Sequence, residues 1–591
     1  MWYICLVLSL SFLFLIPIAA LLFGKSSFFK KIKLSFFYSL YWAVGLSTLC
    51  MFIPINFSNC DGSFLSGLRE FFSTVSKAMT VFGAGCDEKI INASLPFAPE
   101  NIRVVYQVLG EFLSILGPIL AVGFVLSFFG NISEKIKLRF SHFDNLRVFT
   151  QLTEKSLILA NDFVSDEKTT IVFTGILDTT KEEYASLLER AKNLGAICLK
   201  QDVTDINFNK HSKKKNIAIF VMSENETENL NVSLKLIEKY KTRANTDLYV
   251  FSVKKDCEII LSADNKGEIK VRRINEVHSN VYGYLYEFGE KLFETAKEND
   301  HGTKTISAVV VGIGKYGTEF IKALSWYCQM DGYELEINGF DKNKLAKEKF
   351  TALVPDLLNP KYNNVYVKGE AQYNINIHSD FDVDTDSFYK KINEIKNATY
   401  VLVSLGNDDD NIRVSLELRA LFERMNIHPI INTIVYNSDQ KKNLESIKNY
   451  KGQEYDIKSI GELTKTYSKA VIINSKLEKA GKAVHMKYDG SKEDDFWNYE
   501  YCYSSSIASA IHKKARISCG IKGANKDEKD LTIEERDIIE PLEHRRWNAY
   551  MRASGYVYNE KRYDLAKTHN DLIAFDKLSE SEKRKDSIVA T

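Results

Sequence analysis

The sequence has nine cysteines in 591 residues but no C-x-x-C pair, which argues against a zinc site or a dense disulfide framework. The formal net charge is only +1 at pH 7, so no basic excess points to a nucleic-acid partner. Long apolar runs are missing after residue 130, whereas the first 130 residues are crowded with Phe, Leu, Ile and Val. The chain therefore begins as an apolar protein and continues as a charged one, long enough for roughly three to five domains.

Three apolar segments are long enough to cross the ~30 Å hydrocarbon core of a bilayer as helices. They cover residues 1–23, 34–55 and 104–129, and the third contains Glu111. A cleaved signal peptide is the alternative for residues 1–23, but no basic region precedes this segment. We therefore expect residues 1–130 to be a transmembrane region in the lipid bilayer of the plasma (inner) membrane.

Basic residues beside these segments predict their orientation. Four lysines lie between the first and second segments, and Lys135, Lys137 and Arg139 follow the third. Both clusters are predicted to be cytoplasmic, because Lys and Arg are enriched in the cytoplasmic loops of membrane proteins. The N-terminus is then outside, and residues 131–591 lie in the cytoplasm.

The stretch between the second and third segments predicts a re-entrant pore loop. Residues 64–80 have the pattern of a short amphipathic helix, and a turn containing Thr and Gly follows directly. Irregular backbone at membrane depth is tolerated where it lines a cavity, and glycine lets carbonyl groups turn toward an ion. Cys60 and Cys86 flank the loop on the outside, where they can form a disulfide. The predicted pore-lining residues are Thr80, Val81, Phe82, Gly83, Ala84 and Gly85.

This arrangement resembles the two-helix and pore-loop module of potassium channels, with residues 34–55 as outer helix and 104–129 as inner helix. The family's filter is Thr-Val-Gly-Tyr-Gly; here Phe82 intervenes, Ala84 replaces the aromatic residue, and Lys77 in the pore helix is atypical. The resemblance implies a homotetramer around a permeant cation, with potassium as the family's ion. The alternative is an interfacial helix on a non-conducting membrane anchor.

After a basic, partly helical linker at 131–165, strand and helix patterns alternate twice. Apolar strands that alternate with amphipathic helices indicate a parallel sheet covered on both faces. We therefore predict two tandem Rossmann-like α/β domains at 166–300 and 301–485, with a long insert at 350–395. The predicted strands lie at 169–176, 196–203, 216–223, 247–253, from 306 onward, 333–341, 398–406 and 428–436.

The second of these domains contains a G-x-G-x-x-G motif. Gly312, Gly314 and Gly317 follow an apolar strand and open a helix, and Asp341 ends the next strand. These glycines permit a tight turn and the close approach of a pyrophosphate to the helix N-terminus, while the acidic residue binds a ribose hydroxyl. The motif predicts NAD or another adenine nucleotide as a regulatory ligand. The alternative is a strand-to-helix turn without a ligand. The first domain has only Gly175 and is predicted to have lost such a site.

A pore module, a short linker and two Rossmann-like units in one chain resemble channels and transporters regulated by RCK (regulator of potassium conductance) domains. The segment SLGNDDDNIRVSLELR at 404–419 is also similar to that family. The resemblance implies a ring of such domains beneath a tetrameric pore. Ligand binding to this ring pulls on the inner helices.

Residues 490–591 are predicted to form a mainly α-helical domain. Glu543-His544-Arg545-Arg546-Trp547-Asn548, Gly555-Tyr556 and Lys567-Thr568-His569 resemble the ryanodine-receptor (RyR) repeat domain. Cationic side chains suit an anionic ligand, and we expect at least one of the two adjacent arginines to point outward. The alternative is a solvated basic helix face. The candidate ligand-binding residues are His544, Arg545, Arg546, Trp547, Tyr556, Lys567 and His569.

These features predict a ligand-gated ion channel, cation-conducting and opened by a cytoplasmic nucleotide-like ligand, and by resemblance an effector of bacterial antiphage signalling. One alternative is a non-conducting, membrane-anchored nucleotide receptor. Another is a membrane-tethered nucleotide-processing enzyme. No partnered nucleophile or metal-ligand cluster accompanies His544, so the sequence predicts neither an enzyme nor a catalytic metal.

Overall fold

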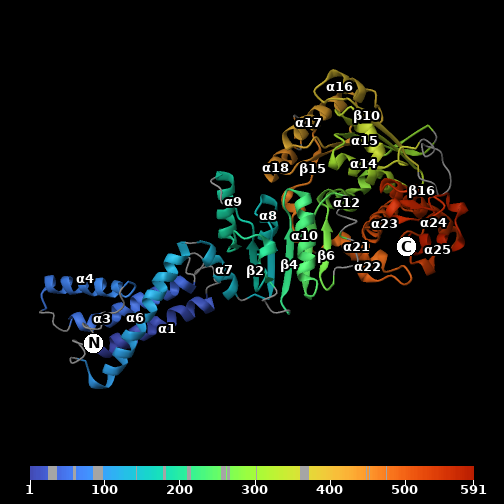
Figure 1. Cartoon of the computed structure of the whole chain (residues 1–591). Coiled ribbons are helices and arrows are strands. Elements are labelled where there is room, and N and C mark those ends of the chain that lie inside the picture. Colours follow the sequence, from blue (N-terminus) through green and yellow to red (C-terminus); the bar gives the residue numbers. More distant parts are fainter. Residues whose placement is uncertain are drawn as a thin grey trace. The chain divides into compact units, whose positions relative to one another are not determined.

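The computed structural model shows two compact units, Met1–Ser141 and His142–Thr591 (Figure 1). Each unit is described by itself. The described residues are 1–23, 36–57, 62–83, 98–128, 130–141, 143–177, 181–208, 214–254, 261, 267–300, 302–359, 372–447, 449–450, 453–473 and 475–590.

The first unit is helical. Three of its helices contain windows long and apolar enough to cross a membrane, Trp2–Ala19, Ser39–Phe57 and Glu100–Val122. The prediction of three candidate spans is therefore confirmed, while the orientation of the chain stays a prediction. The described helices of this unit are α1 (Trp2–Phe23), α3 (Phe36–Phe57), α4 (Phe64–Thr80), α6 (Glu100–Phe128) and α7 (Gly130–Phe140).

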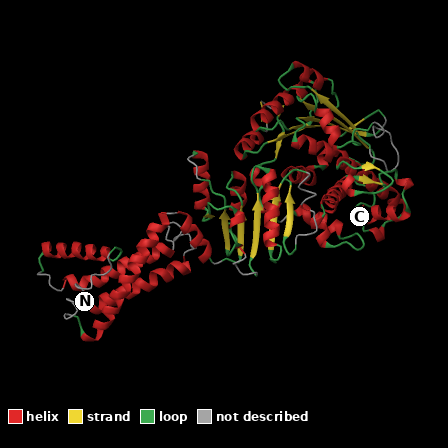
Figure 2. Ribbon diagram, viewed as in Figure 1, coloured by secondary structure: helices red, strands yellow, loops and turns green. Residues whose placement is uncertain are grey.

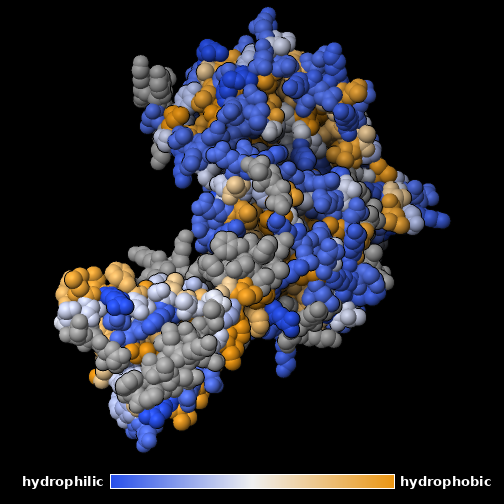
Figure 3. All heavy atoms as spheres, turned by 60° about the vertical axis from the view of Figure 1, so that its left-hand side comes forward, coloured by the Kyte–Doolittle hydropathy of each residue, from blue (hydrophilic) through white to orange (hydrophobic). Residues whose placement is uncertain are grey.

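Apolar side chains lie both inside and outside this unit. Val44, Met51 and Leu113 belong to its buried core. Ile4 on α1 and Ile115 on α6 are among the large apolar side chains that stay exposed. Figure 3 shows part of this apolar surface in orange. A surface of this kind suits contact with lipid, because lipid tails are as apolar as the protein core.

The second unit contains two parallel sheets (Figure 2). The first sheet has the strand order β3-β2-β1-β4-β5-β6, and all its pairs are parallel. This is the strand order of a Rossmann fold. Its strands are β1 (Asn145–Phe149), β2 (Thr169–Phe173), β3 (Ile197–Cys198), β4 (Asn216–Val221), β5 (Thr246–Phe251) and β6 (Lys270–Ile274).

The first sheet begins earlier than the sequence pattern predicted. The predicted linker at 131–165 contains the central strand β1 and the helix α8 (Glu154–Asn161), so a domain start at 166 is wrong. Charge in the middle of β1 hid this strand. The guanidinium of Arg147 lies 5.3 Å from the ring centre of Phe163, and this tertiary contact accommodates a cation that local patterning disfavours.

The second sheet repeats the topology, with the order β10-β9-β8-β11-β12-β15 and parallel pairing along this path. The short strand β7 (Lys297–Glu298) pairs with β8 in antiparallel fashion. Part of the predicted insert at 350–395 is the edge strand β10, and β15 was not predicted. The strands are β8 (Lys304–Val311), β9 (Tyr333–Asp341), β10 (Asn374–Ser379), β11 (Tyr400–Val403), β12 (Ile430–Ile434) and β15 (Ile457–Ile460).

Helices cover both faces of the second sheet. One buried cluster joins Val310 to Phe320 of α14, and another joins Val311 to Leu418 of α17. The two Rossmann-like α/β folds predicted from the sequence are thus confirmed. The helices around the two sheets are α9 (Glu182–Asn193), α10 (Glu226–Tyr240), α12 (Glu276–Phe288), α13 (Glu290–Glu294), α14 (Lys315–Tyr327), α15 (Ala346–Leu353), α16 (Asp386–Asn393), α17 (Asp408–Arg424) and α18 (Ser438–Ser446).

The C-terminal region is mainly helical but has no separate core. Ile511 and Met551 lie in the same buried cluster as Phe320 of α14. A free-standing domain at 490–591 is therefore a wrong prediction, because its helices complete the core beside the second sheet. The elements after β15 are α19 (Leu463–Thr466), α20 (Lys469–Ile472), α21 (Lys476–His485), α22 (Glu493–Asn498), α23 (Glu500–Ser518), α24 (Ile533–Ala553), β16 (Val557–Tyr558), β17 (Thr568–His569) and α25 (Glu580–Ala590).

Candidate functional site

The glycine motif forms a tight turn between β8 and α14. Gly312 has φ +88°, and a β-carbon there would lie 2.4 Å from the carbonyl oxygen of Ser404. A β-carbon on Gly317 would lie 1.9 Å from the carbonyl oxygen of Gly312. Both positions therefore require glycine, the first for its backbone conformation and the second for the close approach of the helix to the loop.

Gly314 has a different role from the other two glycines. It precedes the first residue of α14, and a β-carbon there would meet no atom within 4 Å. Packing within the protein does not demand glycine at this position, whereas a ligand close to the backbone would. The first amide groups of a helix have no intrahelical acceptor and are favourable for a phosphate.

Asp341 lies beside this turn, as the sequence predicted. Its Oδ2 accepts a hydrogen bond of 2.7 Å from the amide of Ile313, and its Oδ1 accepts one of 2.7 Å from the amide of Asn343. These bonds hold the carboxylate at the end of β9, and each oxygen keeps a lone pair for a ribose hydroxyl.

A cleft of about 420 Å³ contains the three predicted elements: Gly312, Gly314 and Asp341 all line it. Its far wall comes from α17, where the Arg413 guanidinium lies 2.9 Å from Asp384 and 3.3 Å from Asp410. The sequence analysis noted the segment 404–419 but did not place Arg413 in the site. The other polar lining residues that it missed are Glu276, Lys315, Lys342, Asp382 and Ser404.

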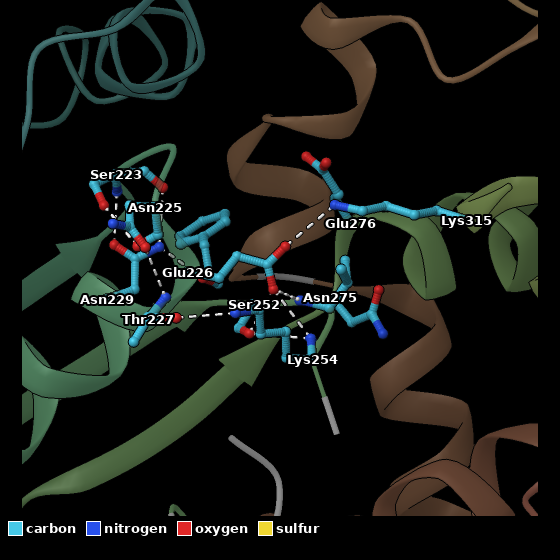
Figure 4. A network of polar contacts seen from close by, with 12 residues as sticks. Ser223, Asn225, Glu226, Thr227, Asn229, Ser252, Lys254, Asn275, Glu276 and Lys315 are labelled. Atoms are coloured by element: carbon cyan, nitrogen blue, oxygen red, sulfur yellow. Dashed lines mark hydrogen bonds and ion pairs between the residues drawn. The ribbon is translucent and has the colours of Figure 1, made fainter. Parts of the chain in front are cut away.

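Glu226 of the first α/β fold reaches the glycine loop of the second (Figure 4). Its Oε1 lies 3.2 Å from the Nζ of Lys315. Its Oε2 accepts hydrogen bonds from the Ser252 hydroxyl at 2.8 Å and from the amides of Val253 at 2.8 Å and Lys254 at 3.1 Å. Burial raises the pKa of the Glu226 carboxyl, but these bonds and the Lys315 ammonium outweigh burial and lower it. The carboxylate is therefore charged at neutral pH.

The corresponding loop of the first sheet follows β1 and contains no glycine between Thr150 and Thr153. Thr153 caps α8 with its own hydroxyl, and Ser156 completes the capping box. The crevice at this loop is lined by Tyr467, whose hydroxyl donates to Glu276 and whose ring lies 5.2 Å from the Lys155 ammonium. The chain itself thus satisfies the groups that would bind a phosphate here, as the missing glycines suggested.

The cationic cluster predicted in the C-terminal region is wrong in its geometry. Arg545 and Arg546 are both buried, with 3% and 2% of their surface exposed. Arg545 lies 2.9 Å from Asp331 of the second α/β fold, and Arg546 lies 2.5 Å from Glu543 on its own helix. Neither arginine points outward, because each is directed toward a carboxylate that the sequence pattern did not associate with it.

The other predicted C-terminal residues also have internal partners. The His544 ring is 2.9 Å from the carbonyl oxygen of Ile573, and Lys567 donates to the carbonyl of Ser554 at 3.0 Å. Burial lowers the pKa of His569 to about 4, so this ring is neutral at pH 7 and is no cation for phosphate.

The two predicted aromatic residues of this region differ in burial. Tyr556 is buried, as predicted for a core residue. Trp547 is only partly buried, and its indole donates to the Tyr501 hydroxyl at 3.3 Å.

The predicted pore loop is described as far as Gly83; Ala84, Gly85 and both flanking cysteines, Cys60 and Cys86, lie outside the described residues. Thr80 is exposed, while Val81 is buried so closely against α6 that a β-carbon on Gly117 would lie 2.3 Å from its carbonyl oxygen. The Phe82 ring stacks on Tyr41 at 4.1 Å.

The unusual Lys77 of the pore helix has a polar partner. Its ammonium donates to Asn56 of α3 at 2.6 Å, and Asn56 in turn donates to Thr74 at 2.9 Å. In the part of the chain that the structure describes, no group of three His, Cys, Asp or Glu side chains is placed to hold a metal ion.

Comparisons with known proteins add little to this geometry. No family model matches the sequence, and neither does any curated protein. The solved structure of a dipicolinate synthase polypeptide from Bacillus halodurans matches over 49% of this chain and 90% of its own, at 9% sequence identity and a TM-score of 0.17. A likeness at that score carries no argument about fold or function. The Rossmann assignment rests on strand order and pairing alone.

Proposed function

We propose that this protein is a membrane-anchored sensor of an adenine nucleotide, NAD among them, and that ligand binding in the cytoplasm gates an ion pathway formed by the first unit. The observation that carries the proposal is the position of Gly314, with open space above the first turn of α14 and Asp341 beside it. Turn, helix N-terminus and acidic residue together are what a nucleotide requires.

The proposal places the ligand at the glycine loop and not in the C-terminal region. Arg545, Arg546 and Lys567 already contact acceptors of the protein, so a phosphate would have to displace those contacts. The resemblances to RCK-regulated channels and to the RyR repeat domain remain the basis for a tetramer and for the gating role.

Binding is expected to depend on Gly314 and Asp341. Gly314→Val should weaken ADP binding at least tenfold because the branched side chain fills the space for the phosphates, and Gly314→Ala should have a smaller effect. Asp341→Asn should weaken binding about tenfold, since the amide offers only one acceptor oxygen. Calorimetry on the full-length protein in detergent measures these changes.

Folding of the Gly314 variants should be unaffected, because no protein atom lies within 4 Å of the added β-carbon. Equal binding by wild type and Gly314→Val would make the loop a structural turn. If NAD, ADP and ATP all fail to bind wild type at millimolar concentration, the nucleotide assignment is wrong.

A non-conducting receptor is the second candidate, favoured by Lys77. Its ammonium lies one turn before Thr80, where a positive charge repels cations. Flux through liposomes with and without ADP separates the two functions. We expect the nucleotide to change flux in wild type and not in Gly314→Val. Liposomes that bind ADP without any flux would establish the receptor.

A further inference from the structure

Lys315 lies where the two α/β folds meet. It is the first residue of α14, directly after Gly314, and it lines both the glycine-loop cleft and the crevice of the first sheet. Glu276 also lines both cavities. A change at Lys315 is therefore felt on both sides.

Glu226, the partner of Lys315, is held in place. Its side chain is 18% exposed, and three donors at the end of β5 bind one of its oxygens. The other oxygen faces Lys315 at 3.2 Å. The carboxylate is thus a fixed negative charge aimed at the glycine loop.

Lys315 itself can move. Its side chain is 66% exposed, and an ammonium on a flexible four-carbon stem can change partners without disturbing the helix that carries it. A phosphate bound at the first turn of α14 would lie next to the backbone of Lys315. It would offer the ammonium more negative charge than a single carboxylate does.

We propose that Glu226 is an internal competitor for the ligand's phosphate, and that a nucleotide draws Lys315 away from it. This inference rests on the proposed function and specifies it: the ligand class is an adenine nucleotide that carries phosphate, and the pair Lys315–Glu226 reports its arrival. Once Lys315 is bound to phosphate, one oxygen of Glu226 faces an anion across the contact between the two folds. Nucleotide binding and that contact are then thermodynamically coupled.

The test is a double-mutant cycle on the full-length protein in detergent, with calorimetry of ADP and of adenosine as the phosphate-free probe. Glu226→Gln keeps an acceptor oxygen for the three donors but loses the charge. It should tighten ADP binding about three- to tenfold and leave adenosine binding unchanged. Lys315→Met should weaken ADP binding, and Glu226→Gln should bring no gain in the Lys315→Met background.

Glu228→Gln is the matched control, because Glu228 is exposed on the same first turn of α10. It should leave ADP binding unchanged. Glu226→Asp is a second variant that withdraws the carboxylate while keeping its charge, and it should also tighten ADP binding.

Three outcomes oppose the inference. The same gain with Lys315→Met present, or an equal gain for adenosine, would mean that Glu226 does not act through Lys315. Binding of ADP that is unaffected by Glu226→Gln would overturn the competition but leave the nucleotide site intact. Failure of wild type to bind ADP, ATP or NAD would overturn the proposed function, and the competition with it.

Discussion

Replacing Glu543 with glutamine is expected to lower the free energy of unfolding by about 3–5 kcal/mol. Glu543 is fully buried and accepts hydrogen bonds of 2.5 Å from both Arg516 and Arg546 and one of 3.1 Å from Ser509. The neutral amide would leave two buried guanidinium groups without a countercharge. Urea unfolding of the full-length protein in detergent, followed by tryptophan fluorescence, measures the loss.

This effect should depend on pH in a defined direction. Burial raises the pKa of the Glu543 carboxyl, but attraction by Arg546 and Arg516 outweighs burial and brings it to about 2, below the ordinary 4.5. A lowered pKa means that the stabilisation is complete above pH 4.5 and is lost as the pH falls toward 2. The difference between wild type and Glu543→Gln should therefore shrink in acid.

Glu534→Gln is the control for this experiment, because Glu534 is exposed in the first turn of the same helix. It should change the free energy of unfolding by less than about 0.5 kcal/mol. The combined variant Arg516→Met/Glu543→Leu/Arg546→Met should be more stable than Glu543→Gln alone, since removing the whole ionic group leaves no buried charge. The opposite order would contradict this account of the triad.

Glu478→Gln is expected to stabilise the protein at pH 8 by about 3 kcal/mol and to have little effect at pH 4. Glu478 is buried in the first turn of α21, where the Tyr503 hydroxyl donates to it at 2.9 Å. Burial raises the pKa of its carboxyl from 4.5 to about 7. A raised acid pKa means that ionisation opposes folding, so wild type loses stability as the pH rises through this range.

Thermal unfolding of wild type and Glu478→Gln across that pH range measures the effect. The midpoint of the variant should exceed that of wild type above pH 7, and the two should converge in acid. Glu534→Gln again serves as the control with no such trend. Parallel curves at all pH values would show that Glu478 does not ionise in this window.

Much of the α/β architecture follows from local patterning. Runs such as residues 333–341 and 216–221 combine apolar side chains with strand formers, and both are strands. The glycine loop was also predictable, since strand, turn and helix are consecutive in the chain and the turn needs glycine at Gly312 and Gly317.

Strands with charge or little length escaped the pattern. β1 contains Arg147, β10 lies within a stretch taken for an insert, and β15 has only four residues. Their place in a sheet depends on hydrogen bonds from neighbouring strands. A short or charged segment carries little local signal for such pairing.

The C-terminal residues show the limit more sharply. A basic segment on a helix predicts either a ligand site or a solvated face, but Arg545 and Arg546 are buried against Asp331 and Glu543. Asp331 lies 214 residues before Arg545 in the chain. Nothing in the local spacing of charges indicates a partner at that distance.

The sequence by itself determined the three candidate membrane helices, the repeated α/β pattern and the glycine turn with Asp341, because each depends on composition or on residues near one another in the chain. Only the tertiary structure decided that β1 and β10 complete the two sheets, that the C-terminal helices share the core beside the second sheet, and that Glu226 faces Lys315. These features arise from contacts between distant segments. Whether a charged side chain becomes a ligand group, a core ion pair or a solvated residue depends on which carboxylate folding brings to it.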